Sequence, residues 1–348
     1  MRTLLLAATA ALTLGVLGAG AANAAGTKTV KDWTAVCSNL GDCAAFGFSE
    51  EAADTNAYLK IDRQAGPAAQ AQVAIVFDAG DTQPAQTWTL TLDGKPIAGL
   101  GPLRAAGSES GARATLTGAA AQHLIDALRN GQSLELNAAG KAVSSVSLAG
   151  SAAILLWVDD QQGRVGTVTA LVKKGAAPAT SVHARGVPPL IRPAPPASQA
   201  GLPGRVPKVV LAHDSECDRG SSPTDVIARL APGVVLWGPE CNSGAYNQVN
   251  DFFLGDEHAG QLRPVKFPEA AGASEGTGSS DALMNVGYDP KTQTLSSFSK
   301  GRGIADCGAT ETWVWDGKAF QMASSATMPA CRGVPPDDWP TLFVSRQK

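Results

Sequence analysis

Apolar and polar residues alternate in short runs along the first half of the chain. Strict alternation over about four to eight residues indicates a strand with one buried face, because successive side chains of a strand point to opposite faces. Asp93-Gly94, a typical hairpin turn, directly follows one of these runs. The segments that this pattern predicts as strands are residues 58–61, 73–77, 88–92, 133–136 and 143–148.

Two segments of the same half repeat their apolar residues with the helical period instead. Residues 119–129 place Leu124, Ile125 and Leu128 on one side and are followed by an Asn-Gly stop signal. Residues 152–162 form the second predicted helix. This half is therefore expected to be a mostly antiparallel sheet with two helices packed on it.

The second half is predicted to begin with one helix and to continue as a strand meander. Ser222 is a typical N-cap and Pro223 fits the first helical turn, which predicts a short helix that continues to Leu230. Farther on, apolar runs alternate with turn residues such as Asp289-Pro290 and Asp316-Gly317. The strands predicted there are residues 283–288, 294–298, 312–315 and 319–322.

Composition divides the chain into four parts. Residues 1–24 have a basic start, a short apolar run and a small-residue close, which is the pattern of a secretory signal cleaved near Ala24. Residues 176–206 are rich in proline, which removes backbone donors and favours an extended course. We expect this segment to be a semi-rigid linker between domains at 25–175 and 207–348, and a strap packed on one domain is the alternative. The fold class predicted is mainly β (α+β), with two β-rich domains, antiparallel sheets and a few short helices.

Six cysteines fall into three couples along the chain: Cys37 and Cys43, Cys217 and Cys241, and Cys307 and Cys331. In an exported chain they are expected to form disulfides rather than metal or redox sites. The sequence alone does not select one connectivity. We favour local pairing within each couple, because two of the couples would each close a modest loop of 24 residues, which contributes roughly 3 kcal/mol in the chain-entropy model.

Composition and charge exclude several classes of function. The chain has 28 Lys and Arg against 31 Asp and Glu, without long runs of one sign, which argues against nucleic-acid binding. No apolar run after the signal reaches the roughly 18 residues of a membrane span, so no transmembrane segment is expected in the mature chain. There is no Cys-x-x-Cys motif and no ligand set with zinc spacing, so neither a metal nor a cofactor is expected.

The strongest candidates for a ligand-binding site surround a Gly-rich corner. Arg302 and Asp306 lie at this corner, and Trp313 and Trp315 follow on a predicted strand. Period-two spacing puts both tryptophans on one face, which would stack a sugar ring or hold a peptide. The alternative is a core face, in which the tryptophans fill volume and Arg302 pairs with Asp306.

Two further groups of residues are candidates. Tyr246 and Asn247 form a polar and aromatic loop after Cys241. Glycan hydrolysis needs two carboxyl groups about 5 to 9.5 Å apart, and the sequence does not give this separation. The carboxylates considered for that role, each of which also fits a turn or surface position, are Asp159, Asp160, Asp306, Glu311 and Asp316.

Several separated motifs occur in order along nearly the whole mature chain: Asp32-Trp33…Cys37…Cys43, Leu148-Ala149-Gly150…Asp159-Asp160-Gln161…Arg164, and Gly301-Arg302-Gly303…Asp306-Cys307-Gly308…Trp313-Val314-Trp315-Asp316-Gly317…Phe320…Cys331-Arg332-Gly333. In these motifs the chain resembles an uncharacterised proteobacterial family of exported proteins, domain of unknown function 1176. The resemblance implies location and organisation, and it supplies neither an activity nor catalytic residues.

Asp32-Trp33, Leu59-Lys60-Ile61 and Ser147-Leu148-Ala149-Gly150 carry a second, looser resemblance. In these residues the first half is similar to the invasion-associated locus B proteins, which are small, periplasmic and β-rich. Those proteins usually have a further cysteine pair, which is absent here between Cys43 and Cys217. No role in host interaction is therefore carried over.

These features predict a periplasmic or secreted protein that is a non-enzymatic binding or accessory module of the envelope, with an envelope glycan or envelope protein as its partner. The alternative is a hydrolase acting on cell-wall or glycan material, with acidic residues around Asp306 and Asp316. An exposed face at Trp313 and Trp315 would favour the binding module. Two carboxylates facing each other in a cleft would favour the hydrolase.

Overall fold

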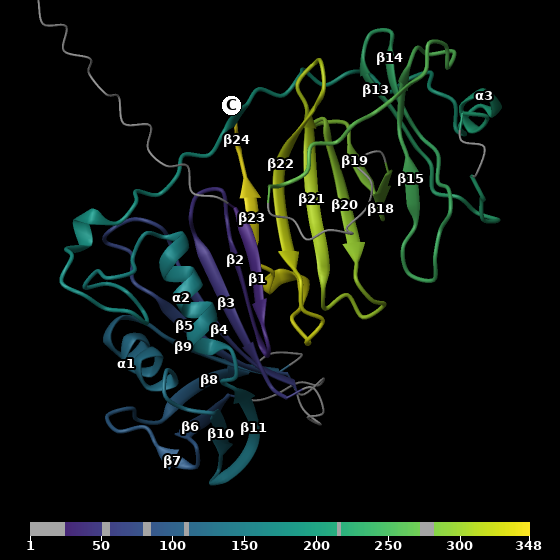
Figure 1. The fold of residues 1–348 in the computed structure, drawn as a ribbon. Coiled ribbons are helices and arrows are strands. Elements are labelled where there is room, and N and C mark those ends of the chain that lie inside the picture. Colours follow the sequence, from purple (N-terminus) through teal and green to yellow (C-terminus); the bar gives the residue numbers. More distant parts are fainter. Residues whose placement is uncertain (1–24, 51–55, 79–84, 108–110, 214–216, 272–281) are drawn as a thin grey trace, which may run out of the picture.

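The computed structural model describes residues 25–50, 56–78, 85–107, 111–213, 217–271 and 282–348 (Figure 1). Strands dominate these residues, and all but one short strand pair are antiparallel, as the sequence predicts for a mainly β protein. The predicted signal peptide, residues 1–24, lies outside the described residues. Within the described part, none of the helices is both long and apolar enough to cross a membrane.

The first half forms one continuous antiparallel sheet. Its strands are β1 (Gly26–Val30), β2 (Trp33–Cys37), β3 (Cys43–Phe48), β4 (Asn56–Arg63), β5 (Gln72–Asp78), β6 (Gln86–Leu92), β7 (Lys95–Pro96), β8 (Leu103–Gly107), β9 (Gly111–Leu116), β10 (Ser133–Ala138) and β11 (Lys141–Ser147). Neighbours follow the order β1-β2-β3-β4-β5-β9-β8-β6-β10-β11, and β7 pairs with β6. The five strands predicted from alternation in this half are present as β4, β5, β6, β10 and β11.

Two helices pack on this sheet, as predicted. In α1 (Gly118–Leu128) the residues Leu124, Ile125 and Leu128 are fully buried, and in α2 (Ser151–Gln161) one side is buried against β1 to β3. Gly150, just before α2, has a φ of 100°, and a side chain there would collide with the carbonyl oxygen of Val30. Glycine thus lets the turn into α2 pass close to the end of β1.

The second half contains shorter sheets. Its elements are α3 (Lys208–Leu211), β13 (Val226–Ala231), β14 (Val234–Gly238), β15 (Val249–Asp251), β16 (Phe253–Gly255), β17 (Arg263–Pro264), β18 (Ala282–Met284), β19 (Gly287–Asp289), β20 (Thr294–Lys300), β21 (Gly308–Trp315), β22 (Phe320–Met328), η2 (Pro336–Asp338), β23 (Thr341–Val344) and β24 (Arg346–Gln347). The sheets are β13-β14-β16-β17, β15-β18 and the five-stranded meander β19-β20-β21-β22-β23. The predicted meander is confirmed, although residues 283–288 divide between β18 and β19.

The helix predicted from Ser222 to Leu230 is wrong, because this segment leads into strand β13. Ala228 and Leu230 are buried while Arg229 between them is only half-buried, so the burial follows the period of a strand. Asp225, just before the strand, accepts hydrogen bonds from Arg219 and from the backbone of Glu240. Pairing with β14 therefore overrides the local capping signals.

The proline-rich segment is packed as a strap, which was the alternative expectation: Arg185 pairs with Asp42 of the first half, and residues 189–194 bond to the second half. We call residues 182–199 the strap; it follows η1 (Ala179–Ser181) and contains β12 (Leu190–Ile191), which pairs in parallel with β24. The backbone N–H of Ala194 donates to the carbonyl oxygen of Trp315 at 2.8 Å. In Figure 1 the strap runs beside the C-terminal strand and on towards β13. The division of the chain into two domains stays a prediction.

Side chains of both halves meet in one apolar cluster. It contains Ala44, Phe46, Phe48, Tyr58, Cys307, Met328, Val334 and Trp339. Beside it, the Asp338 carboxylate accepts hydrogen bonds from the Tyr58 hydroxyl and from Arg113, each at 2.5 Å. Lys60 lies 3.6 Å from the same carboxylate. The two halves are thus held together by packing, by this shared carboxylate and by further polar contacts such as the ion pair of Arg332 with Asp32 at 3.6 Å.

Three disulfides pair each cysteine with its neighbour along the chain: Cys37 with Cys43, Cys217 with Cys241, and Cys307 with Cys331. The local pairing favoured from the sequence is confirmed. The first bridge crosses directly between paired residues of β2 and β3, and the last ties the corner after β20 to the segment before η2. Disulfides in this number are typical of proteins from an oxidising compartment.

Replacing Asp338 with Asn is expected to weaken the contact between the halves. Burial acts to raise the pKa of Asp338, but the hydrogen bonds from Tyr58 and Arg113 outweigh it and lower this pKa below its ordinary value of 3.8. The folded state therefore gains stability from the ionised carboxylate above about pH 4, and loses it as the pH falls through the folded-state pKa. We expect Asp338→Asn to lower the free energy of unfolding by about 2 kcal/mol at pH 7.

Urea unfolding at pH 7 and near pH 3 measures this effect. The deficit of Asp338→Asn should shrink at the lower pH, because the stability gained from the ionised carboxylate is lost as the pH falls towards the folded-state pKa. Asp337→Asn, at the exposed neighbouring residue, is the matched control and should be close to neutral. An equal deficit at both pH values would contradict the role given to the charge.

Candidate functional site

A groove of about 820 Å³ lies where the strap meets the C-terminal sheet. We call it the strap groove. One wall is residues 189–192 of the strap, and the other is formed by Pro268 and Glu269 after β17. The tip of the β21–β22 hairpin and residues of β22 and β23 complete it, and Ala25 and Asn39 of the first half also line it. Segments far apart in the sequence therefore build one concave surface.

Part of the lining of the strap groove is apolar. Leu190 is 38% exposed, which is high for a leucine, and it lines the groove together with Met322 and Phe343. Beneath the wall, the indole N–H of Trp313 donates to the carbonyl oxygen of Pro268 at 2.8 Å, and its ring packs on Phe267 with centroids 5.3 Å apart. The aromatic core therefore fixes the position of this wall.

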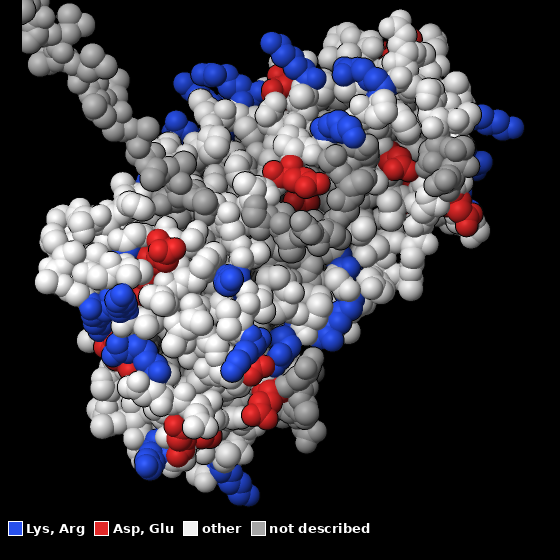
Figure 2. All heavy atoms as spheres, in the orientation of Figure 1, with Lys and Arg blue, Asp and Glu red and all other residues white. Residues whose placement is uncertain are grey.

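The rim of the groove carries charges of both signs. Arg192 and Lys318 are exposed and form no ion pair with any residue in the described ranges. Asp316 accepts hydrogen bonds from the backbone N–H groups of Lys318 and Ala319; burial acts to raise its pKa, but these bonds outweigh it and lower the pKa. Figure 2 shows basic side chains gathered along the edge where Figure 1 places the strap and β24. The rim therefore offers two cations, Arg192 and Lys318, beside the carboxylates of Glu269 and Asp316.

Glu311 lies close to this groove on the same sheet face. The strand register sets Ser297, Glu311, Ser325 and Phe343 in one row across β20 to β23, and Phe343 lines the groove. Burial, and next the negative charge of Glu269, raise the pKa of Glu311 to about 7, while a hydrogen bond from Ser325 opposes this shift. A carboxyl group that is half protonated near neutrality therefore lies near the groove, whose wall carries the exposed carboxylate of Glu269.

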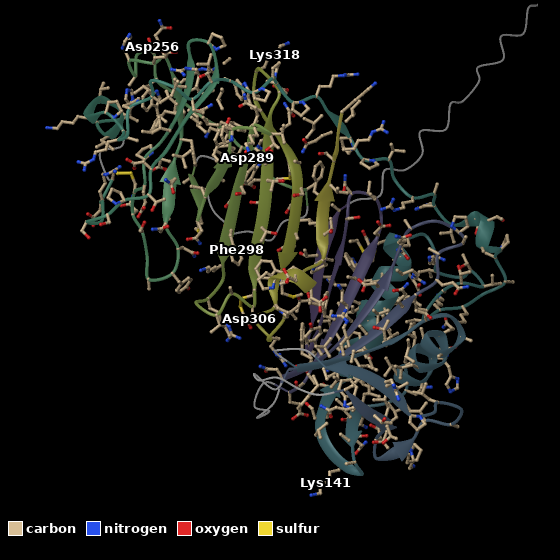
Figure 3. The ribbon with its side chains drawn as sticks, turned by 180° about the vertical axis from the view of Figure 1, so that it is seen from behind. Lys141, Asp256, Asp289, Phe298, Asp306 and Lys318 are labelled. Carbon is tan, nitrogen blue, oxygen red and sulfur yellow. A yellow bond between two sulfur atoms is a disulfide. The ribbon has the colours of Figure 1, made fainter. Side chains whose placement is uncertain are left out.

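Four of the predicted site residues meet at the opposite end of the sheet. Arg302 donates to Asp306 through Nε at 2.6 Å and Nη2 at 2.5 Å, and the backbone N–H of Gly333 donates to Asp306 at 2.7 Å. Tyr246 and Asn247 bond to the carbonyl oxygens of Gly301 and Lys300. Figure 3 shows Asp306 and Lys318 at opposite ends of the sheet.

This corner is held by its own hydrogen bonds. Burial acts to raise the pKa of Asp306, but the bonds from Arg302 and Gly333 outweigh it and lower the pKa; the same contact with Asp306 raises the pKa of Arg302. The pairing of Arg302 with Asp306 is the structural alternative named from the sequence. These two residues brace the corner next to the Cys307–Cys331 disulfide.

The two tryptophans do not form an exposed face. Trp313 is 1% exposed and Trp315 is 2% exposed, because both pack into an aromatic core with Phe267 and Phe320. The hydrolase site expected around Asp306 and Asp316 is corrected too. The eight residues of β21 lie between them, which separates the two carboxylates by more than about 20 Å. That is too far for a glycosidic pair.

Apart from Asp316, sequence reasoning missed the residues that line the groove. Glu269 belongs to no sequence motif, and only the fold of the loop after β17 places it at the groove. The strap offered one signal: Leu190-Ile191 is an apolar pair inside a segment that otherwise lacks one. Among the described residues, no group of three or more potential ligands converges as a metal site would require.

The fold and the groove define a disulfide-braced, β-rich protein with an open groove beside a strap. A family model described as "Protein of unknown function (DUF1176)" matches residues 27–346, so the chain belongs to this family. The uncharacterized protein YpfG of Escherichia coli K12 is 27% identical over 353 residues, covering 92% of this chain and 93% of that protein. No solved structure matches. The looser resemblance to invasion-associated locus B proteins receives no support from these comparisons.

Replacing Glu311 with Gln tests the environment of the groove. A carboxyl group whose pKa is raised from 4.5 to about 7 in the folded state costs stability progressively as the pH rises through this range. Glu311→Gln should therefore stabilise the protein at pH 8, by up to about 3 kcal/mol, and have little effect near pH 4.

Urea unfolding at the two pH values gives this difference directly. Glu269→Gln serves as the companion variant, because it removes the neighbouring charge and should lower the pKa of Glu311 in part. A gain from Glu311→Gln that is the same at both pH values would contradict the raised pKa.

Proposed function

We propose that the protein is exported to the periplasm and acts there as a non-enzymatic binding module of the envelope. The secretory pattern of residues 1–24 and the three disulfides support this compartment. The partner is an envelope glycan or a segment of an envelope protein. It binds in the strap groove.

The observation that carries this proposal is the construction of the groove. Its two walls are fixed before any ligand arrives: the strap wall by pairing of β12 with β24, and the opposite wall by the bond from Trp313 to Pro268. A preformed concave surface loses little conformational freedom on binding. The exposed Leu190 then supplies apolar contact, and the unpaired Arg192 and Lys318 supply polar contacts at the rim.

Leu190→Ser should weaken binding while leaving the fold intact. Leu190 is already partly exposed, so its loss costs the fold little, whereas a ligand that covers it gains the burial of a leucine side chain. That burial is worth roughly 1.5 to 3 kcal/mol, so affinity should fall about tenfold or more. Lys318→Glu should weaken binding further by reversing a rim charge.

The measurement is retention of purified residues 25–348 on two envelope materials, isolated peptidoglycan and solubilised envelope protein. Lys141→Glu changes charge equally at the far end of the molecule, where Figure 3 places Lys141, and is the matched control. The wild type and the Lys141→Glu control should be retained equally on one of the two materials. The groove variants Leu190→Ser and Lys318→Glu should not be retained on it. Retention that is unchanged in both groove variants would place the binding surface elsewhere.

A hydrolase acting on cell-wall glycan is the second candidate, and one observation favours it. Glu311, with a pKa of about 7, suits a general acid, and the exposed Glu269 at the groove wall suits the second carboxylate. Their charges interact, which places them near each other. This pair replaces the one expected around Asp306 and Asp316.

Release of soluble fragments from isolated peptidoglycan tests the second candidate. If the groove is catalytic, Glu311→Gln and Glu269→Gln should each lower the release rate by about a hundredfold or more, while retention on the glycan persists. Retention without any release by the wild-type protein would leave binding as the function and remove the hydrolase.

A further inference from the structure

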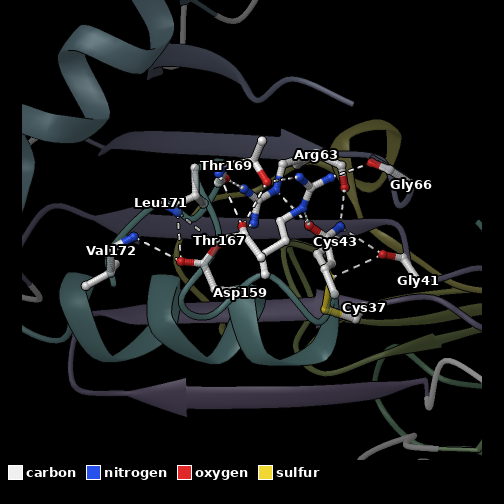
Figure 4. A network of polar contacts seen from close by, with 12 residues as sticks. Cys37, Gly41, Cys43, Arg63, Gly66, Asp159, Thr167, Thr169, Leu171 and Val172 are labelled. Carbon is white, nitrogen blue, oxygen red and sulfur yellow. Dashed lines mark hydrogen bonds and ion pairs between the residues drawn. A yellow bond between two sulfur atoms is a disulfide. The ribbon is translucent and has the colours of Figure 1, made fainter. Parts of the chain in front are cut away.

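A cluster of buried charged groups lies in the first half, away from the strap groove (Figure 4). Arg63 at the end of β4 donates to Asp159 of α2 at 2.7 Å, and their side chains are 2% and 0% exposed. Asp159 also accepts hydrogen bonds from the backbone N–H groups of Leu171 and Val172. The single carboxylate of the cluster is therefore saturated with donors.

A second guanidinium lies beside the first. Arg164 is fully buried, and its Nη2 donates to the carbonyl oxygen of Gly66 at 2.6 Å. The side chain of Gln162 accepts from both Arg63 and Arg164 but carries no charge. Two buried positive charges thus face one negative charge, and burial together with the charge of Arg63 lowers the pKa of Arg164 to about 10. An uncompensated buried charge is costly unless a counter-charge reaches it.

A cavity of about 400 Å³ opens beside this cluster. Arg63 lines it, although this residue is only 3% exposed overall. A guanidinium has five N–H groups, and for Arg63 the described residues provide three acceptors: Gln162, Thr169 and Asp159. Each of its three nitrogens thus donates one hydrogen bond, and two of its N–H groups have no acceptor among the described residues.

The other walls of the cavity also favour an anion. Gly118 and Ala119, the first residues of α1, line it, and the first turn of this helix has neither an acidic residue nor a side-chain cap. The first backbone N–H groups of a helix lack partners within the helix and carry a partial positive charge. Gln70 adds an amide to the wall, and Lys174 adds a cation that pairs with Asp126 at 2.9 Å.

We propose that this cavity binds a small tetrahedral oxyanion, inorganic phosphate or a phosphate monoester, which balances the charge of the Arg63–Arg164 pair. The anion accepts hydrogen bonds from Arg63, from the first turn of α1 and from Lys174. It thereby links the end of β4 to α1 and to the loop after α2. This site is separate from the strap groove and does not depend on the function proposed for that groove.

Phosphate titration of residues 25–348 at constant ionic strength, with sodium chloride as the replacement salt, tests the proposal. Phosphate should bind saturably in calorimetry and raise the Tm by about 2 °C or more above the chloride control. Gln70→Glu places a carboxylate at the cavity and should weaken phosphate binding about tenfold or more through like-charge repulsion. Lys174→Gln removes a cation and should weaken it several-fold.

Gln261→Glu makes the same chemical change at an exposed residue of the second half, outside this cavity, and should bind phosphate like the wild type. Glycerol 3-phosphate distinguishes the two sources of the anion: tighter binding than phosphate points to a monoester, and weaker binding points to free phosphate. A wild-type protein that responds to phosphate no more than to chloride overturns the proposal. Undiminished binding by Gln70→Glu and Lys174→Gln also overturns it.

Discussion

The strap groove depends on the hydrogen bonds that hold a proline-rich segment against the C-terminal sheet. Prolines lack the N–H group that a strand needs, so the strap is held through the few residues and carbonyl groups that remain. Ala194 donates to Trp315, the carbonyl oxygen of Pro189 accepts from Arg346, and that of Ile191 accepts from Lys348. Because proline already restricts the unfolded chain, ordering this segment costs less entropy than ordering an ordinary loop. A few bonds are therefore sufficient to fix a wall.

Much of the fold was predictable from the sequence because local signals and tertiary packing agree. Burial of Leu124, Ile125 and Leu128 in α1 follows directly from their spacing, and the cysteine couples pair as their separation along the chain favours. Disagreement between local signals and tertiary packing explains why the helix predicted over Ser222–Leu230 is wrong. The capping residues there favoured a helix, but Ala228 and Leu230 can both be buried only if the segment pairs with β14 as a strand.

The candidate site was less predictable, because its chemistry depends on distances between segments that the sequence does not give. Trp313 and Trp315 were correctly expected to share a face, yet alternation alone does not say whether that face is covered. Glu311 was named as a carboxylate of interest, but its raised pKa depends on its burial and on Glu269, 42 positions earlier in the sequence. Arg302 and Asp306 were placed together by sequence, and the structure uses them as a brace.

The buried tryptophans still matter for the groove, although they do not touch its contents. Binding in a groove costs conformational entropy, because the ligand and any mobile wall both become ordered. A wall that is already fixed loses no such entropy, so it increases affinity without adding a contact. Trp313 supplies this constraint through its bond to Pro268, next to Glu269. Glu311 lies on β21, the strand that also carries Trp313, and its burial raises its pKa. Strand β21 therefore links the residue that fixes the groove wall to the acid with the raised pKa near the groove.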